Sequence, residues 1–158
     1  MDKKEERSFN KGKRYCLRLL SLRARTEREI EERLKKAGYG DHLTKKILDS
    51  LKKEDLVDDL DFAREWIDWR MRENPKGRRL LVEELRKKGI DDRVIETALE
   101  EKRVILDDVK IAQSIIENRL SAEDAGKLEK VKAKVFRLLI SKGFDPETAE
   151  SVIRAALD

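Results

Sequence analysis

Helix-breaking residues are scarce in this chain, and so are the features of secreted or membrane proteins. Two prolines and seven glycines occur among 158 residues, and few stretches alternate apolar and polar residues as β-strands do. The single cysteine, Cys16, excludes an intrachain disulfide and falls on an apolar helical face, where we expect a buried thiol. No apolar run approaches membrane-spanning length, and the amino terminus does not resemble a signal peptide. These absences predict an all-α, cytoplasmic protein.

The usual signatures of catalysis and metal binding are also missing. The single histidine, His42, lies far from Cys16, so no zinc-ligand spacing is present. The glycines are isolated, and no phosphate-binding glycine loop or nucleophile motif occurs. The carboxylates of Asp58, Asp59 and Asp61 could bind a hard cation, but their place at a predicted helix start favours capping. We expect no enzyme activity, no cofactor and no metal.

Charged residues and helical periodicity are abundant instead. Lys, Arg, Asp and Glu make up 46% of the chain, yet the net charge is only +4. Apolar residues recur at helical spacing and predict nine helices. The predicted helices begin near Lys13, Thr26, Asp41, Asp58, Pro75, Asp91 and Asp107, after the loop at 121–124, and at Asp145. Thr26 and Glu29 have the spacing of a capping box.

Three glycines align three copies of one helical unit. Gly38, Gly89 and Gly143 are 51 and 54 residues apart, each with a leucine four positions earlier and a large apolar residue immediately after. This pattern predicts tandem three-helix repeats in an elongated array with helix-turn-helix-like units. The predicted domains are a flexible tail at 1–12 and repeats at 13–57, 58–106 and 107–158. The acidic third helix at 91–101 argues against base readout in a DNA groove.

An arginine recurs in the first helix of each copy, at Arg23, Arg70 and Arg119. It follows the shared apolar pattern by three residues, so it lies inside the apolar arc of the helix. Two interpretations remain open. The guanidinium either ties neighbouring helices together, with its stem packed on the core, or at least one of the three binds a partner.

Basic charge is concentrated in the middle copy. Residues 70–88 contain eight basic and three acidic side chains, a net charge of +5 (8 − 3). The loop within this segment differs between copies, and variable loops on a constant scaffold often carry function. A solvated helix surface is the alternative. The candidate contact residues are Arg23, Arg25, Arg70, Arg72, Lys76, Arg78, Arg79, Arg86, Lys87 and Lys88.

Three segments of the chain resemble the RecX family of recombination regulators. They are Leu19-Leu20-x-x-Arg23-x-Arg25-Thr26-x-x-Glu29-Ile30, Leu56-Val57-Asp58-Asp59-x-x-Phe62-Ala63 and Leu85-x-x-Lys88-Gly89-Ile90. The resemblance covers roughly residues 13–157 and implies tandem three-helix repeats without catalytic residues. The positions that match the family are Arg23, Asp58, Asp59, Phe62, Ala63, Arg70, Gly77, Leu85, Lys88 and Gly89. Most of them are capping, core or turn positions.

The resemblance also implies a partner, the RecA recombinase filament assembled on single-stranded DNA. Family members bind this filament and restrain its ATPase, strand-exchange and coprotease activities in recombination, DNA repair and the SOS response. Some of them bind DNA themselves. We expect a monomer with this function and no membrane partner. The alternatives are a non-specific DNA-binding helical repeat protein that contacts the phosphate backbone without a recombinase, and a scaffold repeat with no nucleic-acid partner.

Overall fold

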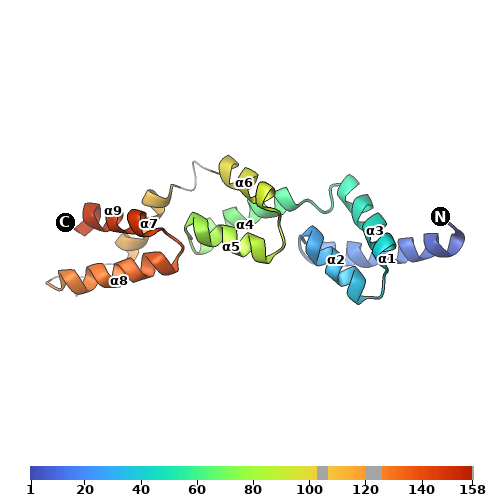
Figure 1. The fold of residues 1–158 in the computed structure, drawn as a ribbon, viewed down its shortest axis with the longest axis horizontal. Coiled ribbons are helices and arrows are strands. Elements are labelled where there is room, and N and C mark those ends of the chain that lie inside the picture. Colours follow the sequence, from blue (N-terminus) through green and yellow to red (C-terminus); the bar gives the residue numbers. More distant parts are fainter. Residues whose placement is uncertain (103–106, 120–125, 158) are drawn as a thin grey trace. The chain divides into compact units, whose positions relative to one another are not determined.

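The computed structural model describes residues 1–102, 107–119 and 126–157, and these residues form helices joined by short connections, with no strand (Figure 1). The all-α prediction is confirmed. In chain order the helices are α1 (Lys3–Leu22), α2 (Glu27–Lys36), α3 (Asp41–Lys53), α4 (Asp59–Glu73), α5 (Arg78–Lys87), α6 (Asp92–Glu101), α7 (Asp108–Arg119), α8 (Leu128–Ser141) and α9 (Pro146–Leu157). Within this described part of the chain, no helix is long and apolar enough to cross a membrane.

The chain divides into two compact units, and the division passes through three helices. The first unit consists of Met1–Glu65 and Leu85–Ile95, and the second consists of Trp66–Glu84 and Glu96–Asp158. Helices α4, α5 and α6 therefore each contribute residues to both units. This grouping differs from the three repeats in the sequence, whose middle copy has no compact unit of its own.

The core of the first unit comes from α1, α2 and α3, together with the segment that follows them. Its buried residues are Cys16, Ile30, Leu34, Ile47, Leu51 and Val57. The predicted burial of Cys16 is confirmed, and burial raises the pKa of its thiol to about 11. Each fully buried aliphatic side chain of this kind stabilises the fold by roughly 1.5–3 kcal/mol.

Helix α1 begins at Lys3, about ten residues before the predicted start. Residues 3–12, which the sequence predicted to form a flexible tail, are part of this helix. Two contacts explain the longer helix. Glu5 forms an ion pair with Lys46 of α3, with Oε1 and Nζ 3.2 Å apart, and Phe9 packs against the first core.

The predicted helix-capping residues are mostly confirmed. Thr26 Oγ1 accepts a hydrogen bond from the Glu29 backbone N–H at 3.2 Å, which is the N-cap half of a capping box, and the Glu29 carboxylate pairs with Arg23 and Arg25. Gly38, Gly89 and Gly143 have φ values of 96°, 82° and 91°, the left-handed conformation that ends a helix and favours glycine.

The predicted start at Asp41 is confirmed, whereas the predicted start at Pro75 was wrong by three residues. Asp41 is the first residue of α3, and Gly40 occupies the N-cap without a side-chain hydrogen bond. Helix α5 begins at Arg78 instead of Pro75. The connection before it stays non-helical because the Gly77 backbone N–H donates to the Lys142 carbonyl oxygen, 2.8 Å away.

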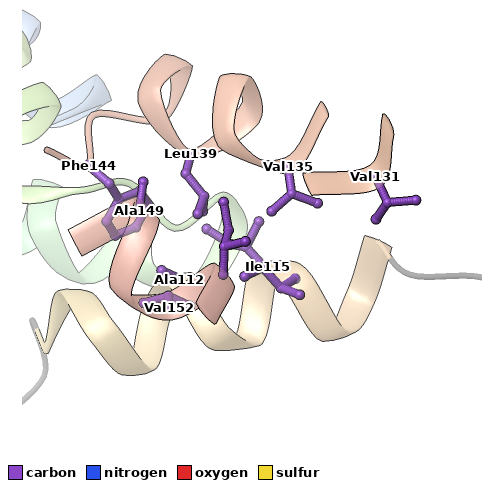
Figure 2. Close-up of a cluster of buried hydrophobic side chains, with 10 residues drawn as sticks. Ala112, Ile115, Val131, Val135, Leu139, Phe144, Ala149 and Val152 are labelled. Carbon is purple, nitrogen blue, oxygen red and sulfur yellow. The ribbon is translucent and has the colours of Figure 1, made fainter. Parts of the chain in front are cut away.

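The core of the second unit includes a cluster built by α7, α8 and α9. Figure 2 shows Val131, Val135 and Leu139 projecting from α8 toward α7. The buried residues of this cluster are Ala112, Ile115, Ile116, Val131, Val135, Leu139, Phe144, Ala149, Val152 and Ile153. It thus repeats the pattern of the first core, with aliphatic residues of the second helix packed on the first and third.

Candidate functional site

Two of the three carboxylates considered as possible cation ligands act as helix caps. Asp58 Oδ1 accepts from the Asp61 backbone N–H at 3.1 Å, and Asp59 Oδ1 accepts from the Glu27 backbone N–H at 2.9 Å. Across the described residues, no group of three or more His, Cys, Asp or Glu side chains is arranged to hold a metal ion. These carboxylates therefore support the start of α4 and α2.

Arg23 and Arg25 share one carboxylate. Both guanidinium groups contact Glu29, and Arg25 Nη1 lies 2.8 Å from Glu29 Oε1. Burial raises the pKa of the Glu29 carboxyl, but hydrogen bonds and charge from Arg23 and Arg25 outweigh burial and leave the pKa below its usual value. The Arg25 side chain is only 8% exposed. Of this pair, only Arg23 is open enough to meet a partner.

Arg70 joins α4 to α5. Its Nε donates to Glu84 Oε2 at 2.9 Å, and the indole Nε1 of Trp66 donates to the same oxygen at 2.8 Å. The guanidinium carbon also lies 5.1 Å from the Trp66 ring centroid and 4.7 Å from that of Trp69, within cation–π range. For this copy, the recurring arginine ties neighbouring helices together.

Arg78 and Arg86 form ion pairs at the protein surface. Arg78 Nη2 lies 2.8 Å from Glu96 Oε1, and Arg86 Nε lies 2.7 Å from Asp92 Oδ1. Both carboxylates are 69% exposed, so solvent screens these pairs and each contributes less than about 1 kcal/mol. A partner can displace such a carboxylate at little cost.

Four of the ten predicted contact residues have no ion pair within the described parts of the chain. They are Arg72, Lys76, Arg79 and Lys87. Arg72, Lys76 and Arg79 belong to the second unit, and Lys87 belongs to the first. Arg72, Arg79 and Lys87 are exposed. These side chains keep their positive charge available to a partner.

A shallow groove in the first unit brings Lys87 and Lys88 beside α2. Lys88 Nζ lies 5.7 Å from the Phe62 ring centroid, and the Lys88 carbonyl accepts from Thr26 Oγ1 at 3.1 Å. The groove is lined by Thr26, Arg28, Glu29, Glu32, Phe62, Lys87 and Lys88. Sequence reasoning did not select Arg28, which adds a third cation here, while Glu29 and Glu32 give the groove mixed charge.

A second groove, between α7 and α8 in the second unit, was missed by sequence reasoning. It is lined by Arg119, Val131, Lys134, Val135, Arg137, Leu138 and Ser141. The three basic residues are exposed, and no acidic side chain is among the described residues that line the groove. One signal could have identified it. Lys134 stands nine residues before Gly143, and Glu29 stands nine residues before Gly38 in the first copy. The same position of the repeat therefore carries a positive charge in the third copy and a negative charge in the first.

Comparison with protein families matches two parts of the chain. Residues 13–51 match the model of the first three-helix domain of RecX, and residues 58–99 match that of its second three-helix domain. A crystal structure of RecX from Lactobacillus salivarius superposes with a TM-score of 0.84 and 26% identity, covering 94% of this chain and 96% of that one. A second crystal structure of a RecX regulatory protein has the same fold, with a TM-score of 0.75.

Curated relatives cover most of the chain as well. Regulatory protein RecX of Mycolicibacterium smegmatis is 37% identical over 150 residues, which are 92% of this chain and 79% of that protein. The protein of the same name from Mycobacterium leprae is 34% identical over 143 residues, 90% of this chain and 83% of the relative. This chain therefore belongs to the RecX family of regulatory proteins.

Proposed function

We propose that this protein regulates the RecA recombinase by binding the filament that RecA forms on single-stranded DNA. The support is membership of the RecX family, whose members named above are regulatory proteins matched over most of their length. The sequence offers no catalytic constellation, so the proposed regulation acts through binding alone. The protein works as a monomer in the cytoplasm in this proposal.

The proposed filament-binding surface is chosen on one observation, the three cations of the second unit that have no ion pair among the described residues. Arg72, Lys76 and Arg79 have no carboxylate partner among the described residues, and the two arginines are exposed. A filament of acidic protein surface and DNA phosphates offers the missing negative charges, and complementary charge speeds association and fixes orientation. The paired Arg78, which also belongs to the second unit, extends this basic surface as a secondary contact, because its exposed ion pair is weak.

Regulation follows if one bound protein touches more than one filament subunit. The active geometry of a filament depends on how neighbouring subunits are arranged. A ligand shifts that arrangement only by binding one state better than another. Preferential binding to an inactive arrangement lowers ATP hydrolysis, strand exchange and coprotease activity together, because all three need the active filament.

The test is RecA ATP hydrolysis on single-stranded DNA with this protein titrated in. We expect inhibition at well below one molecule per RecA subunit. Replacing Arg72 and Arg79 together by Glu should raise the half-inhibiting concentration at least about tenfold, because two attractive contacts become repulsive. Absence of inhibition at a one-to-one ratio would overturn the proposed function.

A matched control removes the same charge elsewhere. Arg14 and Arg18 are exposed on α1 and have no ion pair in the described structure, so Arg14→Glu with Arg18→Glu changes net charge equally. We expect this variant to inhibit within about twofold of the parent. Equal weakening by both pairs would instead favour the second candidate, a protein that binds DNA through overall charge alone.

That second candidate rests on the basic first copy, in which residues 13–57 carry thirteen basic and eight acidic side chains, +5 (13 − 8). It predicts similar affinity for bare single-stranded DNA and for RecA filaments, with affinity falling steeply as salt rises. Measuring both affinities across a salt series separates the two candidates.

A further inference from the structure

The recurring arginine of the first helix is neutralised in two copies by a carboxylate from the second helix. In the first copy Arg23 is paired with Glu29 of α2, and in the middle copy Arg70 is paired with Glu84 of α5. Glu29 stands nine residues before Gly38, and Glu84 stands five residues before Gly89. The scaffold thus offers two second-helix positions from which a carboxylate reaches this arginine.

The third copy lacks both carboxylates. The residue nine positions before Gly143 is Lys134, and the residue five positions before it is Leu138. Arg119, the third recurring arginine, is exposed and has no ion pair within the described residues. One possible partner position is therefore filled by like charge and the other by an apolar side chain.

The α7–α8 groove places this unneutralised arginine among other cations. Arg119, Lys134 and Arg137 are exposed at its rim, whereas Val131 and Val135 are buried at its floor. The two valines project from α8 toward α7 (Figure 2). The groove thus combines a positive rim with an aliphatic floor.

The surroundings of Lys142, at the end of α8, are consistent with this excess of positive charge. Burial lowers the pKa of the Lys142 ammonium, and the positive charges of Lys76 and Arg119 lower it further. Lys142 Nζ donates to the neutral Asn74 Oδ1 at 2.8 Å. Arg119 therefore lies close enough to feel the Lys142 cation, whereas its counterparts in the other two copies pair with a carboxylate.

We propose that the α7–α8 groove binds an acidic peptide segment of a partner protein. Carboxylates of that segment replace the second-helix carboxylates that the third copy lacks, and they pair with Arg119, Lys134 and Arg137. An aliphatic side chain between those carboxylates packs on Val131 and Val135. This is the helix-in-groove form of recognition, in which charge selects the partner and an apolar side chain anchors it.

The floor of the groove favours a peptide over nucleic acid. Phosphates would satisfy the basic rim but would not cover the part of Leu138 and the edges of Val131 and Val135 that stay open to solvent in the groove. Base stacking is strongest on an aromatic surface, and none of the described residues that line the groove is aromatic. An acidic peptide with an aliphatic residue provides carboxylates for the basic rim and an apolar side chain for the floor.

This inference goes beyond the proposed function, and its test contains neither RecA nor DNA. The probe is a fluorescein-labelled peptide of about 14 residues with Glu at i and i+4 on either side of a leucine stripe, long enough for the length of α8 that lines the groove. Binding to the full-length protein is followed by fluorescence anisotropy. We expect saturable binding that weakens at least tenfold when Lys134 and Arg137 are both replaced by Glu.

Three controls define the result. Lys130→Glu places the same type of charge reversal at an exposed position of α8 outside the groove, and it should change affinity less than about twofold per charge. A peptide with Gln for Glu, and one with Ser for Leu, should each bind at least tenfold more weakly. Lack of saturable binding by the parent peptide, equal loss with Lys130→Glu, or stronger binding of an oligothymidylate at the same residues would each overturn the proposal.

Discussion

Arg70 of α4 and Glu84 of α5 form a half-buried ion pair beside two tryptophans, with Nε and Oε2 2.9 Å apart. The two side chains are 22% and 17% exposed, so water screens the pair only partly. Trp66 donates to the same carboxylate oxygen, which makes Glu84 the shared acceptor for an arginine and an indole.

Glu84→Gln should lower the free energy of unfolding by about 1–2 kcal/mol, because a neutral amide leaves Arg70 without its counter-ion. Urea unfolding followed by tryptophan fluorescence measures this directly, since Trp66 and Trp69 lie at the ion pair. Glu83→Gln, at an exposed neighbouring position, should cost less than about 0.5 kcal/mol. Similar losses from both variants would show that the ion pair adds nothing.

Gly77→Ala should destabilise the second unit. A Cβ at this position would lie 2.5 Å from the Gly143 carbonyl oxygen, so the backbone would have to shift and strain the Gly77–Lys142 hydrogen bond. We expect a loss of about 1–3 kcal/mol in thermal or urea unfolding. Gly40→Ala meets open space and should cost less than about 1 kcal/mol. A Gly77→Ala protein as stable as the Gly40 variant would contradict this close contact.

The pH dependence of stability should change in Asp59→Asn. Burial raises the pKa of the Asp59 carboxyl from 3.8 to about 6, against the opposing hydrogen bond from the Glu27 backbone N–H. Because the folded-state pKa is raised, the stability that Asp59 contributes is fully present below pH 3.8 and is lost as pH rises through about 6. Asn keeps the oxygen acceptor without the charge, so the variant should be more stable than the parent above pH 6.

Thermal unfolding of both proteins between about pH 4 and pH 8 tests this expectation. The difference between the two midpoints isolates Asp59 from groups such as Glu29, whose lowered pKa makes its own contribution fall as pH falls. The advantage of the variant should shrink as pH is lowered through about 6. A difference that does not depend on pH would show that Asp59 titrates as in an unfolded chain.

Cys16 should resist alkylation in the folded protein. A thiol with a pKa of about 11 is roughly 100-fold less ionised at pH 8 than one at the ordinary value of 9.0, and the thiolate is the reactive form. Iodoacetamide labelling followed by mass spectrometry should be at least that much slower than in urea-unfolded protein. Equal rates in both states would show that the thiol is accessible.

Local chemistry made much of the fold predictable. Thr26 with Glu29 indicated a helix start, and Gly38, Gly89 and Gly143 indicated helix ends, because caps and left-handed glycines act within a few residues of chain. The errors came from distant contacts. Residues 3–12 join α1 partly because Glu5 meets Lys46, about 40 positions away, which no local pattern records.

The candidate site was predictable in composition but not in which charges remain available. Residues 70–88 could be identified as basic from the sequence alone. The pairing of Arg78 with Glu96 and of Arg70 with Glu84 depends on how helices pack, so paired and unpaired cations look alike in sequence. Lys134 was different, because its place in the repeat can be compared with that of Glu29 by counting back from the aligned glycines.

The start of α2 sets a limit on how this protein can be dissected. The Glu27 amide donates to Asp59, and the Thr26 hydroxyl donates to the Lys88 carbonyl, so the first unit draws on chain well beyond residue 57. A protein fragment that ends at the repeat boundary, residue 57, would lack both acceptors. Part of the interior of the first unit would then be exposed to solvent. Minimal fragments should therefore retain the chain at least through Ile95, whatever the periodicity of the sequence suggests.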